Sequence, residues 1–166
     1  MTQLISSPNS HHAWQRPGTL AEAVRRFLDR QQDLTAALHE FCDEFYLDQR
    51  PAGRWLRIKD APRLTGDRFL DAYLGAVGEH LYRRWRLPGD LPSWTESRER
   101  FQLRQISFCP GVEAMKPFRL AESPIAFRRR MIFTEAEPLR RALMPHDDTF
   151  WYFETLRSGL EKPPAS

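Results

Sequence analysis

The stretch TLAEAVRRFLDRQQDLTAALHEFCDEFY, residues 19–46, decides the fold class. Thr19 and Glu22 have the spacing of a capping box, in which a hydroxyl and a carboxylate satisfy free N–H groups at a helix start. Neither proline nor glycine interrupts the stretch, which predicts one amphipathic helix over residues 20–46. Apolar residues recur there at helical steps of three, four and their sums: Leu20, Val24, Phe27, Leu28, Leu34, Leu38, Phe41 and Phe45.

A second long helix is predicted over residues 67–86, where apolar residues again repeat with helical spacing. Gly75 and Gly78 lie inside it, and each costs about 1 kcal/mol relative to alanine. We therefore expect another backbone to approach closely at these glycines. The connector over residues 47–66 contains prolines and glycines, and the alternating polarity of residues 54–58 predicts one short extended piece.

Shorter helices are predicted in the C-terminal half. A second capping box opens a charged helix over residues 93–103, and Ser123-Pro124 has Ser as N-cap and Pro at the first helical position. Prolines bracket another short helix over residues 138–145. The last helix is predicted from about Asp147 to Leu160, with an acidic N-cap.

These patterns predict an all-α fold, because strand signals are thin throughout. We expect two long amphipathic helices and four or five short helices in one compact domain over residues 18–160. Residues 1–17 and 161–166 are expected to be disordered tails.

The composition favours a soluble cytoplasmic protein. The 166 residues are 41% hydrophobic, and they contain neither an apolar run long enough to cross a membrane nor a secretion signal. Two cysteines, Cys42 and Cys109, have no motif spacing, so we expect reduced thiols. The net charge is +3. Acidic residues are interspersed with the 22 arginines and three lysines, so the basic residues form no continuous stripe along the sequence.

The arginines gather in two groups, of which one is a candidate for binding. Arg128, Arg129 and Arg130 form the densest basic cluster and could anchor phosphates or an acidic partner. The alternative is a solvated helix face with an ion pair to an acidic residue such as Glu122 or Glu135. Arginines 83, 84 and 86 are explained by the favourable dipole at a helix C-terminus.

The aromatic run Phe150-Trp151-Tyr152-Phe153 surrounds the last helix on all sides. One domain core cannot easily bury all four rings, and Trp and Tyr dominate binding interfaces. The alternative is a helix packed on its own core with one or two rings half exposed. We predict a partner-binding surface on this helix that includes Trp151, Phe153, Leu156 and Leu160.

Catalytic and metal-binding patterns are incomplete. His39, Cys42 and Asp43 have a spacing that a metal could use, but no second cluster supplies further ligands, so no metal or cofactor is predicted. Arg141 and His146 have the spacing of a pair found in some helical ribonucleases of toxin systems, although Pro145 separates them. No phosphate loop, nucleophile elbow or paired carboxylates are evident, so no catalytic residue is predicted and a non-enzymatic role is favoured.

Several blocks between residues 71 and 133 resemble a group of small helical bacterial proteins without an assigned activity. Such proteins are often encoded beside nucleotidyltransferase-like or helix-turn-helix proteins, which implies a role associated with toxin–antitoxin systems. The chain departs from the group's pattern at residues 104–107, where a Trp-Phe pair is expected. The resemblance rests on Asp71-Ala72-Tyr73-Leu74, Trp94-Thr95-Glu96, Glu122-Ser123-Pro124-Ile125-Ala126-Phe127-Arg128-Arg129-Arg130 and Ile132-Phe133.

Together these features predict a protein-interaction module, the antitoxin-like or accessory member of a bacterial two-gene system, whose protein partner is encoded nearby. Two alternatives remain open. One is a nucleic-acid-binding regulator that places arginines on phosphates, with salt-dependent affinity. The other is a small helical ribonuclease toxin that uses Arg141 and His146.

Overall fold

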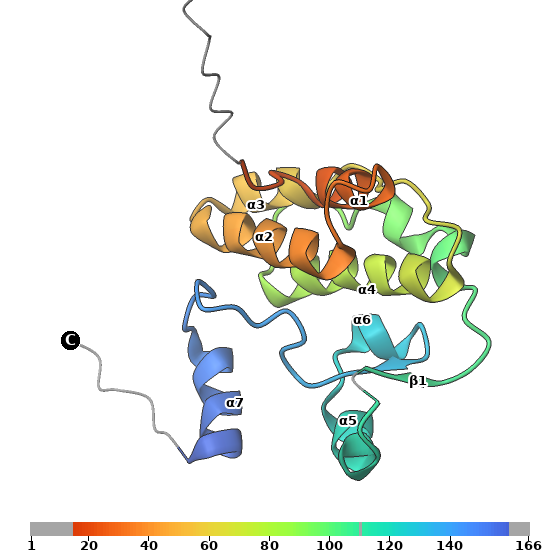
Figure 1. Ribbon diagram of the computed structural model, residues 1–166. Helices are drawn as coiled ribbons and strands as arrows, with labels where there is room; N and C mark the ends of the chain where they lie inside the picture. Colours follow the sequence, from red (N-terminus) through yellow and green to blue (C-terminus); the bar gives the residue numbers. More distant parts are fainter. Residues whose placement is uncertain (1–14, 110, 160–166) are drawn as a thin grey trace, which may run out of the picture.

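The computed structural model describes residues 15–109 and 111–159, and its architecture is mostly helical (Figure 1). Helix α4 lies in the middle, with α1, α2 and α3 on one side and α6 on the other. The 3₁₀ helices η1 and η2 also pack against α4. The bounds are α1 (Leu20–Leu28), α2 (Leu34–Leu47), α3 (Pro51–Ile58), α4 (Arg68–Arg84), η1 (Ser93–Glu96), η2 (Arg98–Phe101) and α6 (Ile125–Arg128).

The remaining elements lie beyond α6, on the side away from α1–α3 (Figure 1). Strands β1 and β2 form a parallel pair in which Ser107 is opposite Ile132 and Phe108 is opposite Phe133. The described chain is therefore mostly helical but not all-α as predicted. The bounds are β1 (Ser107–Phe108), η3 (Glu113–Met115), α5 (Lys116–Glu122), β2 (Ile132–Phe133) and α7 (Asp148–Ser158).

The prediction of one helix over residues 20–46 was wrong, because the chain turns between α1 and α2. Arg30 has a left-handed φ of 56°, which an α-helix does not allow. Asp33 then caps α2, since its side chain accepts a hydrogen bond from the N–H of Ala36 at 2.9 Å. The Thr19 half of the predicted capping box is present, since its hydroxyl accepts from the N–H of Glu22 at 3.1 Å, whereas the Glu22 carboxylate accepts from the N–H of Gly18, one residue before the cap, at 2.9 Å.

Other local predictions also need correction. Residues 54–58 are not extended but belong to α3, which begins with Pro51 in its first turn. The predicted helix over residues 93–103 is divided into η1 and η2, and residues 138–145 form turns rather than a helix. Ser123 does not cap α6; its hydroxyl instead donates to the carbonyl oxygen of Thr134 at 2.9 Å.

The helix predicted over residues 67–86 corresponds to α4, and side chains rather than a backbone approach its two glycines. A Cβ atom on Gly78 would lie 2.5 Å from the ring of Trp94, and one on Gly75 would lie 2.8 Å from the Cβ of Arg100. These glycines therefore allow η1 and η2 to pack closely on α4.

The hydrophobic core lies between α4 and its neighbours on both sides. Phe127 of α6 is fully buried, and its ring contacts Tyr73 and His80 of α4 at centroid distances of 5.6 and 5.7 Å. The following core residues have no exposed surface: Leu20, Val24, Phe41, Phe45, Leu74, Val77, Leu81 and Phe127.

The chain ends differ in part from the predicted tails. Residues 15–17 pack on the domain, since Pro17 is buried and Arg26 donates to the carbonyl oxygen of Gln15 at 2.6 Å. Residues 1–14 and 160–166, including Leu160, lie outside the described residues. In residues 15–109 and 111–159, no helix is long and apolar enough to cross a membrane.

Candidate functional site

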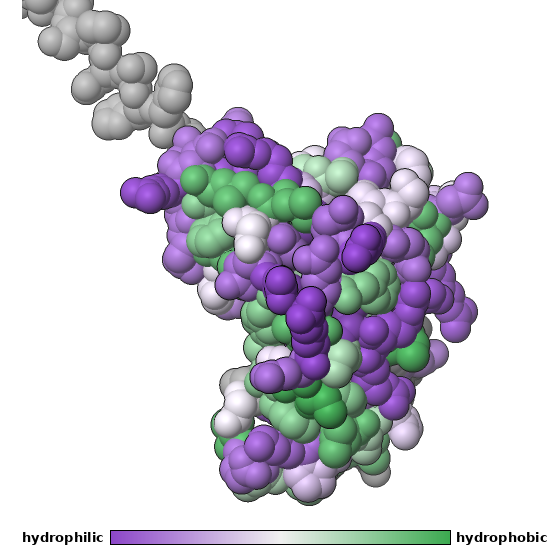
Figure 2. All heavy atoms as spheres, turned by 90° about the vertical axis from the view of Figure 1, so that its right-hand side faces the viewer, coloured by the Kyte–Doolittle hydropathy of each residue, from purple (hydrophilic) through white to green (hydrophobic). Residues whose placement is uncertain are grey.

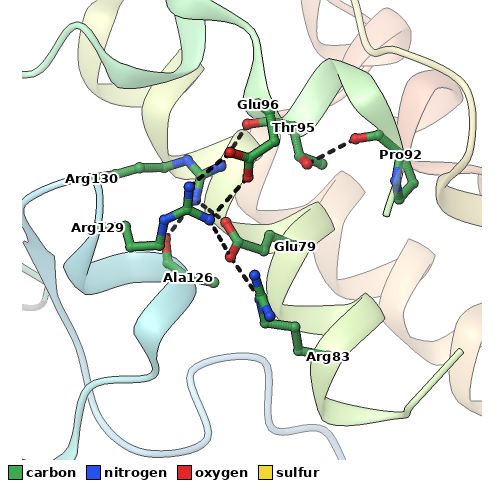
Figure 3. A network of polar contacts seen from close by, with 8 residues as sticks. All are labelled: Glu79, Arg83, Pro92, Thr95, Glu96, Ala126, Arg129 and Arg130. Carbon is green, nitrogen blue, oxygen red and sulfur yellow. Dashed lines mark hydrogen bonds and ion pairs between the residues drawn. The ribbon is translucent and has the colours of Figure 1, made fainter. Parts of the chain in front are cut away.

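The three arginines predicted to bind a partner lie at and just after the end of α6, in three different environments. Arg128 is exposed and forms no ion pair with any described residue. Arg129 pairs with both Glu79 and Glu96, at 2.8 and 2.7 Å (Figure 3). Arg130 is only 1% exposed. The predicted cluster is therefore not one exposed basic surface, and Arg130 in particular is not available to a partner.

The two terminal nitrogens of Arg130 are hydrogen-bonded within the domain (Figure 3), whereas its buried Nε has no hydrogen-bond partner among the described residues. Its guanidinium donates to the carboxylate of Glu79 at 2.6 Å and to the backbone carbonyls of Thr95 at 2.6 Å and Ala126 at 2.7 Å. These bonds join α6, η1 and α4. Because every acceptor belongs to the domain itself, Arg130 connects α6 and η1 to α4.

Glu79 is the acceptor at the centre of this network and has no exposed surface. It also accepts from Arg83 at 2.7 Å and from Arg129 at 2.8 Å. Burial raises the pKa of Glu79, but the hydrogen bonds from Arg130, Arg83 and Arg129 outweigh burial and hold its pKa below the usual value. The carboxylate is therefore ionised and fully engaged, which makes it unsuitable as a general base.

The aromatic run of α7 is divided between the core and the surface. Phe150 is 5% exposed and stacks on His146 at a centroid distance of 3.9 Å, whereas Tyr152 is 61% exposed. The predicted N-cap is confirmed, since Asp147 accepts from the N–H of Phe150 at 2.9 Å. Phe153 and Trp151 are partly buried, and they face different hollows.

A groove of about 330 Å³ lies between α5 and α7, and Phe153 and Leu156 line it. Its apolar lining is unusually open to solvent: Phe118 is 57% exposed, Leu156 67% and Met115 41%. Figure 2 shows apolar residues gathered on the lower part of the face that includes α5. Large apolar groups that remain exposed together mark interaction sites or ligand grooves. Two of the predicted binding residues therefore belong to one surface, which Trp151 does not share.

Sequence reasoning missed the α5 side of this groove. The signal was present at Lys116-Pro117, where a proline in the first helical turn precedes Phe118. A helix of seven residues is too short for a periodic pattern to be distinctive. The exposure of Phe118 depends on α7 being held apart from α5, which no local pattern encodes.

The groove also contains six charged side chains, of which three are neutralised within the domain. Glu137 pairs with Arg84 at 2.6 Å, and Arg140 and Arg157 both pair with Glu154. The other three form no ion pair with any residue that the structure describes: Arg119, Glu122 and Glu135. Glu122 and Glu135 are exposed, so the open side of the groove is acidic.

Arg141 and His146 line one open hollow of about 440 Å³, together with Trp151. Arg141, however, forms two hydrogen bonds of 3.1 Å to the carboxylate of Asp43. The His146 ring stacks on Phe150 and meets the edge of Trp151, at centroid distances of 3.9 and 5.6 Å. Arg141 and His146 thus lie in one region, but Arg141 is paired with Asp43.

The thiols and His39 form no metal centre in the described part of the chain, where no three His, Cys, Asp or Glu side chains are placed to hold an ion. Cys42 and Cys109 are both free thiols. Burial raises the pKa of Cys42 to about 12, so this thiol is protonated and unreactive at neutral pH.

Comparison with known proteins adds no relative: no protein-family model matches the chain, and neither a curated protein nor a solved structure is significantly similar to it.

Proposed function

We propose that this chain is a protein-interaction module that binds an amphipathic helix of a partner protein in the groove between α5 and α7. The observation that carries the proposal is the exposure of Phe118 and Leu156 on the two sides of one groove. A partner helix would cover both residues with its apolar face, as in helix-in-groove recognition.

Charge supports this choice of partner. Glu122 and Glu135 are exposed and unpaired in the described chain, and both line the groove. Ser123 and Thr134 are joined by a hydrogen bond of 2.9 Å, which holds the two neighbouring carboxylates on one side of the groove. Complementary charges give specificity and increase the rate of association. The partner helix therefore carries lysine or arginine beside its apolar residues.

The biological setting belongs to the same proposal. The resemblance of residues 71–133 to small proteins of paired bacterial genes supports an antitoxin-like or accessory role in the cytoplasm, with the partner encoded nearby. Most of the conspicuous arginines are engaged inside the domain, which leaves the groove as the surface best suited to bind that partner.

The test is affinity capture from the native host, with and without nuclease, using wild-type protein and two groove variants, Phe118→Asp and Leu156→Asp. The matched control is Leu64→Asp, since Leu64 is 50% exposed and does not line the groove. We expect one stoichiometric protein with wild type and the control, unaffected by nuclease and lost with both groove variants. Equal capture by the groove variants would contradict the proposal.

A second pair of variants tests the charge argument. Reversing Glu122 and Glu135 to lysine should weaken capture without changing the melting temperature, because both side chains are exposed. If the captured material is nucleic acid, or is lost on nuclease treatment, the chain is instead a nucleic-acid-binding regulator.

The ribonuclease alternative is favoured by one observation, the position of Arg141 and His146 in the same hollow. It predicts RNA cleavage that His146→Ala abolishes. Absence of cleavage by wild type would remove this alternative.

A further inference from the structure

Arg119 of α5 lines the groove while being only 7% exposed. Within the described part of the chain Arg119 donates one hydrogen bond, from a terminal nitrogen to the backbone carbonyl of Cys109 at 3.2 Å. The Nε atom is buried and has no hydrogen-bond partner, and no carboxylate among residues 15–109 and 111–159 lies within ion-pair distance of the guanidinium. A cation removed from water in this way is costly unless it is paired.

The other buried arginines of the domain follow that rule. Arg26 pairs with Glu22 at 2.6 Å, Arg100 with Asp71 at 3.4 Å and Arg130 with Glu79 at 2.6 Å. An unpartnered Nε is shared with Arg130, but Arg119 alone among the buried arginines of the described chain lacks a carboxylate partner, and it is the one that lines an open apolar groove. Unfavourable groups kept in a folded protein often serve a binding site.

We infer that Arg119 is an anion-binding residue, and that the partner segment in the groove places a side-chain carboxylate against its guanidinium. This inference rests on the proposed function and specifies the partner's chemistry. The planar guanidinium matches a carboxylate through two parallel N–H donors. Phe118, Phe153 and Leu156 then surround the apolar groups beside that carboxylate.

The other charges of the groove select a single negative charge. Arg119 supplies one unpaired cation, whereas Glu122 and Glu135 add two carboxylates on the exposed side. A dianion such as a phosphate monoester would be repelled by these carboxylates, and like charges at close range are unfavourable. The recognised helix therefore carries one Asp or Glu within its apolar face and basic residues along its edges.

A simple probe of this chemistry is decanoate, which joins one carboxylate to an apolar chain, with decanol as its uncharged control. Binding of both is measured by calorimetry and by ¹⁵N NMR on the full chain, as wild type, Arg119→Gln, Arg119→Lys and Phe118→Ser. The matched control is Arg128→Gln, since Arg128 is exposed and lies outside the groove.

We expect decanoate to bind wild type and Arg128→Gln at least about tenfold more tightly than Arg119→Gln, with Arg119→Lys in between. Decanol should bind wild type and Arg119→Gln equally. Because Arg119 has no carboxylate partner in the described fold, Arg119→Gln should keep the wild-type melting temperature or raise it. A marked fall in melting temperature would show a structural role and overturn the inference.

The outcomes separate this inference from the proposed function. If decanol and decanoate bind wild type equally, and Phe118→Ser weakens both, the groove remains an apolar binding site and the inference about Arg119 is wrong. If neither compound binds wild type, the inference about Arg119 is wrong, and the capture experiment with the groove variants decides the proposed function. Decanoate binding that depends on Arg119, combined with capture of a partner that is unaffected by Phe118→Asp, would support the anion site and contradict the docking of a protein there.

Discussion

The carboxylate of Glu79 and the guanidinium of Arg130 form a 2.6 Å ion pair in which neither side chain has any exposed surface. The two residues are 51 positions apart in the chain and connect α4 to the segment after α6. Removing two charges from water is expensive, and the pair is tolerated because further hydrogen bonds reach the Glu79 carboxylate and both terminal nitrogens of Arg130. Replacing one member of the pair leaves the other charge buried without its partner.

We therefore predict that Glu79→Gln lowers the free energy of unfolding by about 3–5 kcal/mol, measured by urea denaturation at neutral pH. The control is Arg83→Ala. The Arg83 side chain is 48% exposed, and Glu79 keeps its two other arginines when Arg83 is removed, so the expected loss is below about 1 kcal/mol. Equal losses in the two variants would show that the buried pair is not the main contribution.

Local sequence patterns explain how far the fold could be predicted. The helical period of the apolar residues predicted α4. The acidic residue at the start of the last predicted helix, Asp147, was correctly predicted as the N-cap of α7. The break between α1 and α2 was missed because Leu28 and Leu34 are six positions apart, which equals two steps of three and so looks like one continuous helical face. The spacing of apolar residues shows which face of a helix is buried, but it does not show a turn between two helices that continue the same spacing.

Long-range charge pairing explains why the candidate site could be predicted only in part. Arg129 and Arg130 were expected at a surface, and their partners Glu79 and Glu96 lie at least 33 residues away in the chain. Phe153 and Leu156 were identified because aromatic and aliphatic residues crowd α7, and both line the groove. Arg119 had no distinguishing local signal, because its lack of a carboxylate partner among the described residues becomes visible only in the folded chain.

Because His80 is buried, we predict that the protein loses stability in mild acid. Burial and the neighbouring Arg84 lower the pKa of His80 to about 3, against an ordinary value of 6.5 in the unfolded chain, despite the opposing effect of Glu79. Between these two pKa values the unfolded state binds a proton at His80 and the folded state does not. The stability that neutral His80 contributes is therefore present above pH 6.5 and is lost as the pH falls toward 3. Between about pH 7.5 and about pH 5.5, wild type should lose about 1 kcal/mol more than His80→Gln in urea unfolding. Parallel pH profiles would contradict this explanation.

Replacing Gly78 with alanine should change the stability in the direction opposite to that expected from helix propensity. Gly78→Ala should gain about 1 kcal/mol from propensity alone. The new Cβ atom would lie 2.5 Å from the Trp94 ring, whose Nε1–H donates to the carbonyl of Ile58 at 3.0 Å and fixes its position. Overpacking costs about 1–3 kcal/mol, so we expect a net loss, measured by thermal unfolding. In a Trp94→Leu background the same substitution should become neutral or stabilising; a loss unchanged by that background would exclude the clash as its cause.

Replacing Arg84 should destabilise one part of the structure rather than the whole domain. Its guanidinium pairs with Glu137 at 2.6 Å and with Asp147, the N-cap of α7, at 2.6 Å. Arg84→Met should therefore release α7 and the loop before it, while α4 keeps its core contacts. Hydrogen exchange should show faster exchange at residues 148–158 and little change at residues 68–81. Arg84→Lys should not restore protection, because an ammonium group cannot reproduce the paired donors that reach two carboxylates.

The same variant should also affect the groove, because α7 forms one of its walls. We expect Arg84→Met to weaken decanoate binding although Arg84 does not line that groove. Wild-type protection and wild-type affinity in Arg84→Met would show that another contact positions α7.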